Sequence, residues 1–338
     1  MYLLKEGISL KPYNTFGIDV KARYFAEIFS EEDLKLLTDN PVFKENKLLV
    51  LGGGSNMLFT ADYEGLVLKV SISGMEAEIF RDTVTVTAGA GVVWNDLVNY
   101  CVENDYAGME NLSLIPGTVG ASPIQNIGAY GVELKDVFES CRAFNITTGQ
   151  VERFDYSACR FAYRDSIFKN ELKGQYIITE VTFRLSTNAK INSQYGAIQQ
   201  VLADRRITQP TIADISEIVS EIRVSKLPDP STIGNAGSFF KNPIISEPEY
   251  LSLKAAFPKI ISFPAGAGFM KLAAGWLIEQ CGFKGKVVGN TGTWKNQALV
   301  LVNHGGATGQ EVYSFSESII EAVWAKFGVK LEREVNIL

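Results

Sequence analysis

The sequence predicts a mixed α+β protein of two domains. Its 338 residues are more than a single domain usually contains. The first half is rich in short apolar and β-branched runs, which are typical of strands, whereas helical periodicity prevails in the second half. Prolines at positions 210, 228 and 230 mark the change. We therefore expect a domain boundary near residue 205, with one domain over residues 1–205 and another over residues 206–330.

Short apolar runs predict the strands. The run 47–51 ends in glycines, and residues 83–87 alternate between apolar and polar side chains. Residues 141–146 and 151–156 flank Thr147-Thr148-Gly149-Gln150, which predicts a hairpin. Further strands are expected over residues 66–72, 176–185 and 330–337, and a second hairpin is expected from residues 286–288 and 298–302.

Capping signals and apolar faces predict the helices. Ser30 is followed by Asp33, and Thr308 by Glu311, both at capping-box spacing. Gly328 suits a helix end because a left-handed residue there is best without a side chain. Helices are expected from Ser30 onward, over residues 94–103, 211–224 and 271–280 (ended by Gly282), and from Thr308 to Gly328.

Composition excludes several classes of protein. Acidic residues outnumber basic ones, so the net charge is 32 − 38 = −6. Nucleic-acid binding depends on basic groups that neutralise phosphate, so we expect no nucleic-acid partner. There is no run of 18 apolar residues and no signal peptide, which predicts a cytoplasmic protein with no membrane contact.

The four cysteines and the single histidine limit the chemistry further. The cysteines form no CxxC pair, which is typical of reduced thiols, and they are Cys101, Cys141, Cys159 and Cys281. One histidine, His304, argues against a His-rich metal site and against a Ser-His-Asp triad. We therefore expect no metal.

A glycine-rich motif follows the predicted strand 47–51. Consecutive glycines leave backbone N–H groups uncovered, which suits a diphosphate. The spacing is not that of a dinucleotide-binding Rossmann motif, because Met57 stands where the third glycine belongs. A tight turn between strands is the alternative interpretation, and both stay open at this point. The motif consists of Gly52, Gly53, Gly54, Ser55 and Asn56.

A long segment over residues 111–131 contains four glycines and two prolines and no charge, so it cannot form a long helix. Its small residues would let a flat ring lie against the backbone. Gln125, Asn126 and main-chain groups could bond the polar edge of such a ring. Ordered loops of this length tend to be functional, although a buried structural loop is the alternative.

Three further positions could carry chemistry. Arg164 lies among aromatic and aliphatic residues and so needs an anion, with Asp165 as the simplest partner. Ser238 follows small residues that expose its hydroxyl, but it lacks the surroundings of a nucleophile and fits a proton donor or a turn residue better. In the tail, alternation places Glu332 and Glu334 on one face of the expected strand, and a solvated face is the ordinary explanation.

Together these segments, in this order, resemble the family of UDP-N-acetylenolpyruvoylglucosamine reductases, flavoenzymes of peptidoglycan precursor synthesis and cell-wall biogenesis. The resemblance begins at Lys11-Pro12-Tyr13-Asn14-Thr15-Phe16-Gly17 and covers almost the whole chain. It implies an α+β chain with a two-lobed FAD-binding fold of the vanillyl-alcohol-oxidase (PCMH) type, split near residue 74, followed by an α+β substrate-binding domain. We expect the closing strand 331–338 to return to the first domain.

The resemblance also implies roles for individual residues. The glycine-rich motif would hold the FAD diphosphate. Five residues of the long segment would lie along the flavin, namely Ile115, Ile124, Gln125, Ile127 and Gly128. Arg164, Ser238 and Glu334 match the catalytic positions. Substrate would be bound by Tyr195, Arg223, Lys226, Asn242 and Gln297. Ser193-Gln194-Tyr195-Gly196 resembles the type I form, whose tyrosine loop closes over substrate.

The chain departs from the family pattern at two places. Ala121 stands where we expect Ser, and Arg333 stands between the two tail glutamates where we expect Pro.

The function implied is the NADPH-dependent reduction of UDP-N-acetylglucosamine enolpyruvate to UDP-N-acetylmuramate. Hydride would come from flavin N5 and a proton from Ser238, while Arg164 and Glu334 would stabilise the enolate. We expect non-covalent FAD and a monomer. Another FAD-dependent oxidoreductase of the same fold and a non-catalytic nucleotide-sugar sensor are the alternatives.

Overall fold

The computed structural model describes residues 2–188 and 190–338, and its contacts divide the chain into two compact units. Unit 1 comprises Met1–Ile8, Ala22–Gly53 and Glu64–Arg223, and unit 2 comprises Ser9–Lys21, Gly54–Tyr63 and Val224–Leu338. The boundary predicted near residue 205 separates an FAD-binding part of the chain from a substrate-binding part, and this boundary stays a prediction.

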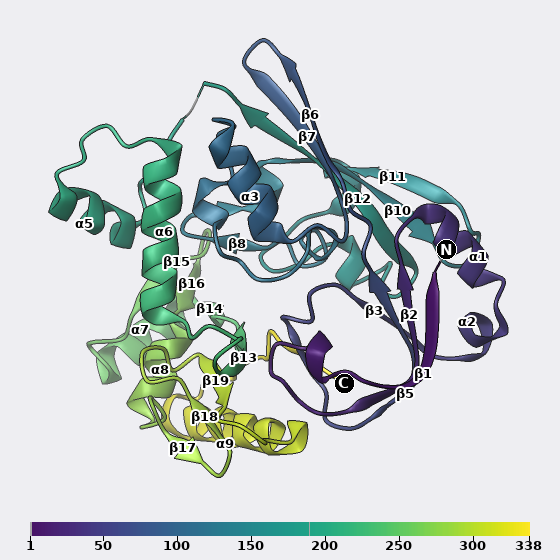
Figure 1. Ribbon diagram of the computed structural model, residues 1–338. Helices are drawn as coiled ribbons and strands as arrows, with labels where there is room; N and C mark the ends of the chain where they lie inside the picture. Colours follow the sequence, from purple (N-terminus) through teal and green to yellow (C-terminus); the bar gives the residue numbers. More distant parts are fainter. Residues whose placement is uncertain (1, 189) are drawn as a thin grey trace. The chain divides into compact units, whose positions relative to one another are not determined.

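Unit 1 is built on two sheets. The first has the strand order β1-β2-β5-β3, and β3 runs parallel to β5. The second has the order β11-β10-β12-β7-β6 and is antiparallel throughout. In Figure 1 the β6–β7 hairpin runs beside β12, which pairs with β7 as far as Thr83 at the hairpin turn. The strands are β1 Leu3–Ser9, β2 Lys21–Ile28, β3 Leu48–Leu51, β5 Tyr63–Val70, β6 Met75–Phe80, β7 Thr83–Gly89, β10 Phe138–Asn145, β11 Val151–Asp155 and β12 Tyr176–Ser186, with a small β8 Gly128–Ala129 and β9 Val132–Glu133 pair.

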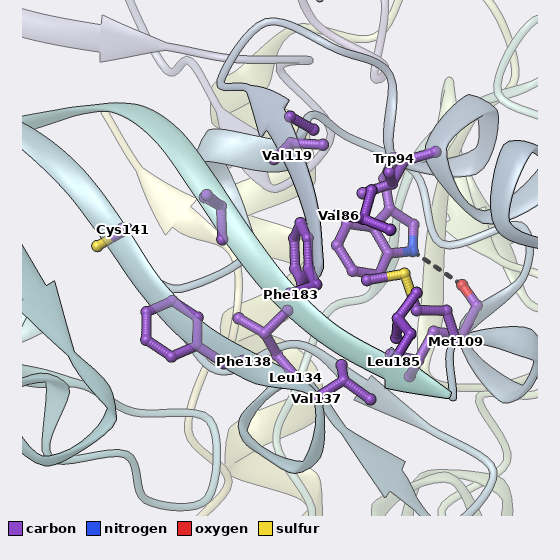
Figure 2. Close-up of a cluster of buried hydrophobic side chains, with 14 of the residues drawn as sticks. Val86, Trp94, Met109, Val119, Leu134, Val137, Phe138, Cys141, Phe183 and Leu185 are labelled. Atoms are coloured by element: carbon purple, nitrogen blue, oxygen red, sulfur yellow. Dashed lines mark hydrogen bonds between the residues drawn. The ribbon is translucent and has the colours of Figure 1, made fainter. Parts of the chain in front are cut away.

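Helix α3, Trp94–Glu103, covers the five-stranded sheet and completes the larger core of unit 1. Trp94 packs edge-on against Phe183 of β12, with 5.9 Å between the ring centroids. Figure 2 shows Trp94, Phe183 and Met109 in this cluster, with the bond from Trp94 Nε1 to the Leu112 carbonyl (2.9 Å) as a dashed line. The core therefore reaches directly into the segment 111–131.

The remaining helices of unit 1 are short, except for α6. Ser30 caps α1 as predicted, since its Oγ accepts from the N–H of Asp33, while the Asp33 carboxylate accepts from the N–H of Phe29. Helices α5 and α6 pack on each other through a separate apolar cluster. These helices are α1 Glu31–Thr38, α2 Pro41–Glu45, α4 Tyr156–Cys159, α5 Gly196–Arg205 and α6 Ile212–Lys226.

Unit 2 contains a four-stranded antiparallel sheet with the order β13-β19-β18-β17 and a three-stranded sheet with the order β14-β16-β15. A short parallel pair joins β4 near the glycine motif to β20 at the C-terminus. The strands are β4 Met57–Leu58, β13 Gly234–Ser238, β14 Ile244–Ser246, β15 Ser262–Pro264, β16 Phe269–Leu272, β17 Val287–Val288, β18 Thr291–Thr293, β19 Val300–Asn303 and β20 Asn336–Ile337.

The α-helices that lie wholly within unit 2 are α7 Glu247–Ala256, α8 Ala274–Gln280 and α9 Gly309–Phe327. Helix α9 begins with the predicted capping box between Thr308 and Glu311, and Gly328 ends it in the left-handed conformation (φ 64°). Its buried face packs beside β18 and β19 (Figure 1).

Three predictions of secondary structure are wrong in detail. Lys271 and Leu272 belong to β16, so α8 begins only at Ala274. The segments 286–288 and 298–302 are not hairpin partners, because β18 pairs with both β17 and β19. Residues 330–335 are not a strand, because single backbone bonds hold the tail there and regular pairing begins at Asn336. In the described residues, no helix combines the length and apolarity needed to cross a bilayer.

Candidate active site

The first two glycines of the glycine-rich motif touch the long segment of unit 1. A Cβ atom on Gly52 would lie 2.5 Å from Oγ1 of Thr118, and one on Gly53 would lie 2.8 Å from Cα of Gly117. Gly53 therefore packs against the backbone of Gly117, which only glycine permits at this separation, whereas Gly52 faces the Thr118 side chain. Gly53 is exposed, so its backbone remains accessible to a ligand.

The rest of the glycine-rich motif belongs to unit 2. Gly54 is in the left-handed region (φ +62°), and a Cβ there would lie 2.0 Å from the Tyr13 carbonyl oxygen. Ser55 and Asn56 are half-buried. The amide of Asn56 donates from Nδ2 to the Glu334 carbonyl (3.3 Å). Within unit 2 the motif is thus attached to the backbone of a predicted catalytic residue.

The segment 111–131 is ordered by α3 and by unusual backbone conformations. The Gly117 carbonyl accepts from the N–H of Trp94 (3.0 Å), and Asn95 Oδ1 accepts from the N–H of Leu114 (2.6 Å). Leu114 and Tyr130 have φ of 57° and 49°, which side chains other than glycine rarely adopt. Strained backbone that the surroundings hold in place is characteristic of functional sites.

The side chains predicted to lie along the flavin are all half-buried, in contrast to the fully buried core beneath them. Ile115, Ile124 and Ile127 pack with one side on the core cluster of α3, which leaves part of each side chain exposed. Asn126 differs, because it is fully buried and bonds the Ala162 carbonyl, the Glu133 carboxylate and the N–H of Lys135. The prediction that Asn126 bonds the edge of a ring is therefore wrong, because its side chain is buried and anchors the loop.

Arg164 lies against the same segment. Its Nη2 donates to the Gly128 carbonyl across 2.7 Å, and a Cβ on Gly128 would lie 3.2 Å from Nη1. Arg164 itself has a φ of 55°. The next residue but one, Ser166, donates from Oγ to the Ile124 carbonyl (2.7 Å). The turns at Ile124 and Gly128, which are predicted to line the flavin, are therefore both tied to the Arg164 segment.

A second cation stands close to Arg164. Nε of Arg223 donates to the Leu114 carbonyl (3.2 Å). Burial lowers the pKa of Arg223, the phenol of Tyr130 opposes this, and the charge of Arg164 lowers it further. Two neighbouring cations, one of them partly buried, favour a site that receives an anion.

Tyr130 is a residue that the sequence did not single out, and it organises this part of unit 1. Its ring stands edge-on to Tyr195, with 5.2 Å between the centroids. Asn111 donates from Nδ2 to the carbonyls of Tyr130 (3.1 Å) and Asn192 (2.9 Å). The tyrosine segment around Tyr195 is therefore docked on the long segment. The sequence feature that could have pointed to Tyr130 is its position beside Gly131 at the end of the long segment.

Ser238 and Glu334 are neighbours through the backbone of unit 2. Ser238 ends β13, is exposed, and follows an irregularity in the pairing with β19. Gly237 is left-handed there (φ +67°), and such irregularities re-aim side chains next to active sites. The Phe239 carbonyl accepts from the N–H of Glu334 (2.9 Å), and Phe239 and Phe240 are buried.

The predicted substrate amides present hydrogen-bond donors. Oδ1 of Asn242 accepts from the N–H of Ala274 (2.9 Å), and Oε1 of Gln297 accepts from the N–H of Leu299 (3.3 Å). Because their oxygens already accept these hydrogen bonds, both side chains offer their NH2 groups to a ligand. Lys226 is exposed at the end of α6. In the described residues, no group of three or more His, Cys, Asp or Glu side chains is placed to hold a metal.

The fold and the site in unit 1 define a flavin-binding oxidoreductase. A glycine cradle that any Cβ would fill, half-buried isoleucines and a nearby cation fit the requirements of FAD. A family model described as an FAD binding domain matches residues 23–155, and one described as UDP-N-acetylenolpyruvoylglucosamine reductase, C-terminal domain, matches residues 229–338.

Relatives extend this over the whole chain. The protein is 48% identical over 338 residues to a UDP-N-acetylenolpyruvoylglucosamine reductase of Flavobacterium johnsoniae, with 99% of each chain covered. It is 49% identical over 335 residues to the Pseudomonas aeruginosa protein of that name, with 99% of this chain and 98% of the relative covered. A crystal structure of such a reductase from Thermus caldophilus shares the fold, with a TM-score of 0.68 at 22% identity, covering 100% of this chain and 99% of that one.

The chain belongs to the UDP-N-acetylenolpyruvoylglucosamine reductase family. This confirms the predicted family and the predicted fold class, with an FAD-binding fold followed by an α+β domain. It also confirms that the protein is an FAD-dependent oxidoreductase.

Proposed function

We propose that this protein reduces UDP-N-acetylglucosamine enolpyruvate to UDP-N-acetylmuramate, with NADPH as the reductant, in peptidoglycan precursor synthesis. The observation that carries this proposal is the 48% identity to a reductase of that name over 99% of both chains. The proposal further holds that the enzyme acts as a monomer in the cytoplasm and serves cell-wall growth, and so cell shape and division.

The residues proposed to hold FAD form two groups. Gly52, Gly53, Gly54, Ser55 and Asn56 would bind its diphosphate through backbone and side-chain donors. Ile115, Ile124, Gln125, Ile127 and Gly128 would line its ring. When bound, FAD supplies the hydride from its N5 position after NADPH has reduced it.

Arg164 is proposed to bind the substrate carboxylate. Addition of hydride to the terminal carbon of the enolpyruvyl group converts that CH2 carbon into a methyl group. The alkene electron pair moves onto the α-carbon and its carboxylate, which carry the charge of an enolate. A guanidinium offers two parallel donors to such a group, and fixed charge aimed at a developing oxyanion is usually the largest catalytic contribution. The bond to Gly128 supports this role because it restrains the orientation of the guanidinium.

Glu334 and Ser238 are proposed to complete the reaction. Glu334 would lie near the enolate and help to stabilise it, which requires the carboxyl to be protonated or tightly paired. Ser238 would transfer its hydroxyl proton to the α-carbon, so that hydride and proton together saturate the double bond. The exposure of Ser238 and the backbone bond between Phe239 and Glu334 support the assignment.

The nucleotide part of the substrate is assigned to a set of donors. Arg223 and Lys226 carry positive charge for the diphosphate, Tyr195 would close over it, and Asn242 and Gln297 offer NH2 groups. Local cations of this kind explain how a chain of net charge −6 accepts an anionic substrate.

Anaerobic titration of NADPH-reduced protein with UDP-N-acetylglucosamine enolpyruvate tests the proposal. We expect NADPH to bleach the visible flavin band and stoichiometric substrate to restore it, with UDP-N-acetylmuramate as the product. A non-catalytic sensor would show no bleaching. A different oxidoreductase of this fold would bleach with its reductant but would not be reoxidised by this substrate. Either outcome rejects the proposed function.

A further inference from the structure

The C-terminal tail of unit 2 carries Glu334 on a segment with little regular structure. Residues 330–335 contain only an isolated bridge between Arg333 and Phe240. Two backbone bonds flank that bridge, from Lys241 N–H to the Glu332 carbonyl and from Glu334 N–H to the Phe239 carbonyl, both 2.9 Å. These bonds set the register of the tail against the Ser238 strand, and the buried side chains of Leu331 and Val335 hold the tail further.

The Arg333 side chain supplies a further attachment, to α9. Its Nε donates to Oγ of Ser316 (2.9 Å) and its Nη2 donates to Oε1 of Glu317 (2.6 Å). The guanidinium also lies 4.5 Å from the ring centroid of Tyr313. The Arg333 side chain is 18% exposed and that of Glu317 is 41% exposed, so the pair is partly shielded from water. The fork of an arginine is required, because lysine cannot make both bonds in a fixed plane.

The other charged neighbour of Glu334 is held differently. Glu332 pairs with Lys241 at 3.2 Å, but its side chain is 69% exposed. An exposed pair of this kind contributes little. Successive side chains of an extended segment point to opposite sides. An anchor at Arg333 therefore helps to hold Glu334 on the other side of the tail.

We propose that Arg333 is a positioning residue for the reaction, and that its bonds to Ser316 and Glu317 on α9 orient the tail so that the Glu334 carboxyl faces its substrate. The inference rests on the proposed function and deepens it. Arg333 acts through the tail backbone and touches neither substrate nor flavin. It stands where the family resemblance led us to expect proline.

The test separates the two half-reactions of the FAD-loaded, full-length protein. In Arg333→Gln we expect NADPH to reduce the flavin at a rate within about twofold of the unchanged protein. Reoxidation by UDP-N-acetylglucosamine enolpyruvate should slow by about tenfold to 10²-fold, because small displacements of a catalytic group have effects of this size. Arg333→Lys should restore part of the rate. Glu317→Gln should slow the same step, and the double variant should be no slower than Arg333→Gln alone.

Lys241→Met is the matched control, because it removes the other tail ion pair without touching Arg333. We expect both of its half-reactions to be unchanged. Thermal unfolding of every variant completes the set, and Glu317→Gln keeps the test open if Arg333→Gln does not fold. Reoxidation of Arg333→Gln at the unchanged rate, or an equal loss in both half-reactions, overturns the inference. If the unchanged protein is not reoxidised, the proposed function itself fails, which is a distinguishable result.

Discussion

The guanidinium of Arg164 donates to the backbone carbonyl of Gly128 across 2.7 Å. The bond joins a residue whose own backbone is left-handed (φ 55°) to a glycine whose missing side chain leaves room for the guanidinium. A charged group held in this way needs no reorganisation when negative charge develops beside it.

Replacing Arg164 by lysine should therefore slow substrate reduction more than a retained positive charge would suggest. We expect a loss of about 10²–10³-fold in flavin reoxidation by substrate, as for removal of one oriented donor, with FAD still bound. Arg160→Lys is the control, because Arg160 is also left-handed (φ 47°) but pairs with Glu171 at the surface. Stopped-flow absorbance measures both variants, and equal behaviour of the two would refute the role of Arg164.

Gly53→Ala should weaken FAD binding. The new Cβ would lie 2.8 Å from Cα of Gly117, a backbone atom that cannot move aside cheaply. We expect at least about a tenfold loss of affinity, equivalent to ~1.4 kcal/mol. The control is Gly196→Ala, where the added Cβ meets no atom within 4 Å. Titration of the FAD-free protein with FAD gives both dissociation constants. An unchanged dissociation constant for Gly53→Ala would contradict the proposed role of the glycine-rich motif in binding FAD.

Glu31 should make stability depend on pH. Burial favours its neutral form, but hydrogen bonds from Arg142 and Thr179 outweigh this and hold the pKa of Glu31 below its ordinary 4.5. The folded state then binds fewer protons, so the stabilisation is complete above about pH 4.5 and disappears as the pH falls through the folded pKa.

Glu31→Gln should accordingly lower the free energy of unfolding by about 1–2 kcal/mol at pH 7, a range set by charged hydrogen bonds that are partly exposed. The difference should shrink as the pH falls below 4.5. Glu32→Gln, the exposed neighbour in the same helical turn, should change stability by less than about 0.5 kcal/mol. Denaturant unfolding at several pH values checks this prediction. A difference in unfolding free energy between Glu31→Gln and the unchanged protein that does not vary with pH would contradict it.

FAD should be released by acid precipitation. Covalent attachment through cysteine needs a thiolate, yet burial raises the pKa of Cys101 to about 12. A hydrogen bond with Cys159 and burial raise the pKa of Cys141 as well. His304 is an exposed turn residue of unit 2. A colourless precipitate and yellow supernatant are expected, whereas yellow colour that stays with the precipitate would show a covalent bond.

Features that depend on sequence neighbours were predictable. The Thr308–Glu311 cap and the helix over residues 94–103 occur as expected, because each is decided within a few residues. Features that depend on distant partners were not. Strand β18 is short and contains Gly292, so it gives little strand signal, and pairing with β17 and β19 creates it.

The site shows the same division. The glycine-rich motif and the segment 111–131 were recognisable from composition, and the structure brings Gly53 and Gly117 together. The anchoring of Asn126 depends on Ala162 and Lys135, and that of Arg333 on Ser316 and Glu317. No local pattern encodes such pairings. The catalytic roles of Arg164, Ser238 and Glu334 stay predictions.

Stopped-flow mixing of Ser238→Ala, first with NADPH and then with UDP-N-acetylglucosamine enolpyruvate, tests the central claim most directly. The account predicts that NADPH still bleaches the flavin at close to the unchanged rate, while reoxidation by substrate falls by about 10²–10⁴-fold, the usual contribution of a positioned proton donor. Loss of flavin reduction by NADPH, or reoxidation by substrate at the unchanged rate, would contradict the assignment of Ser238 as the proton donor.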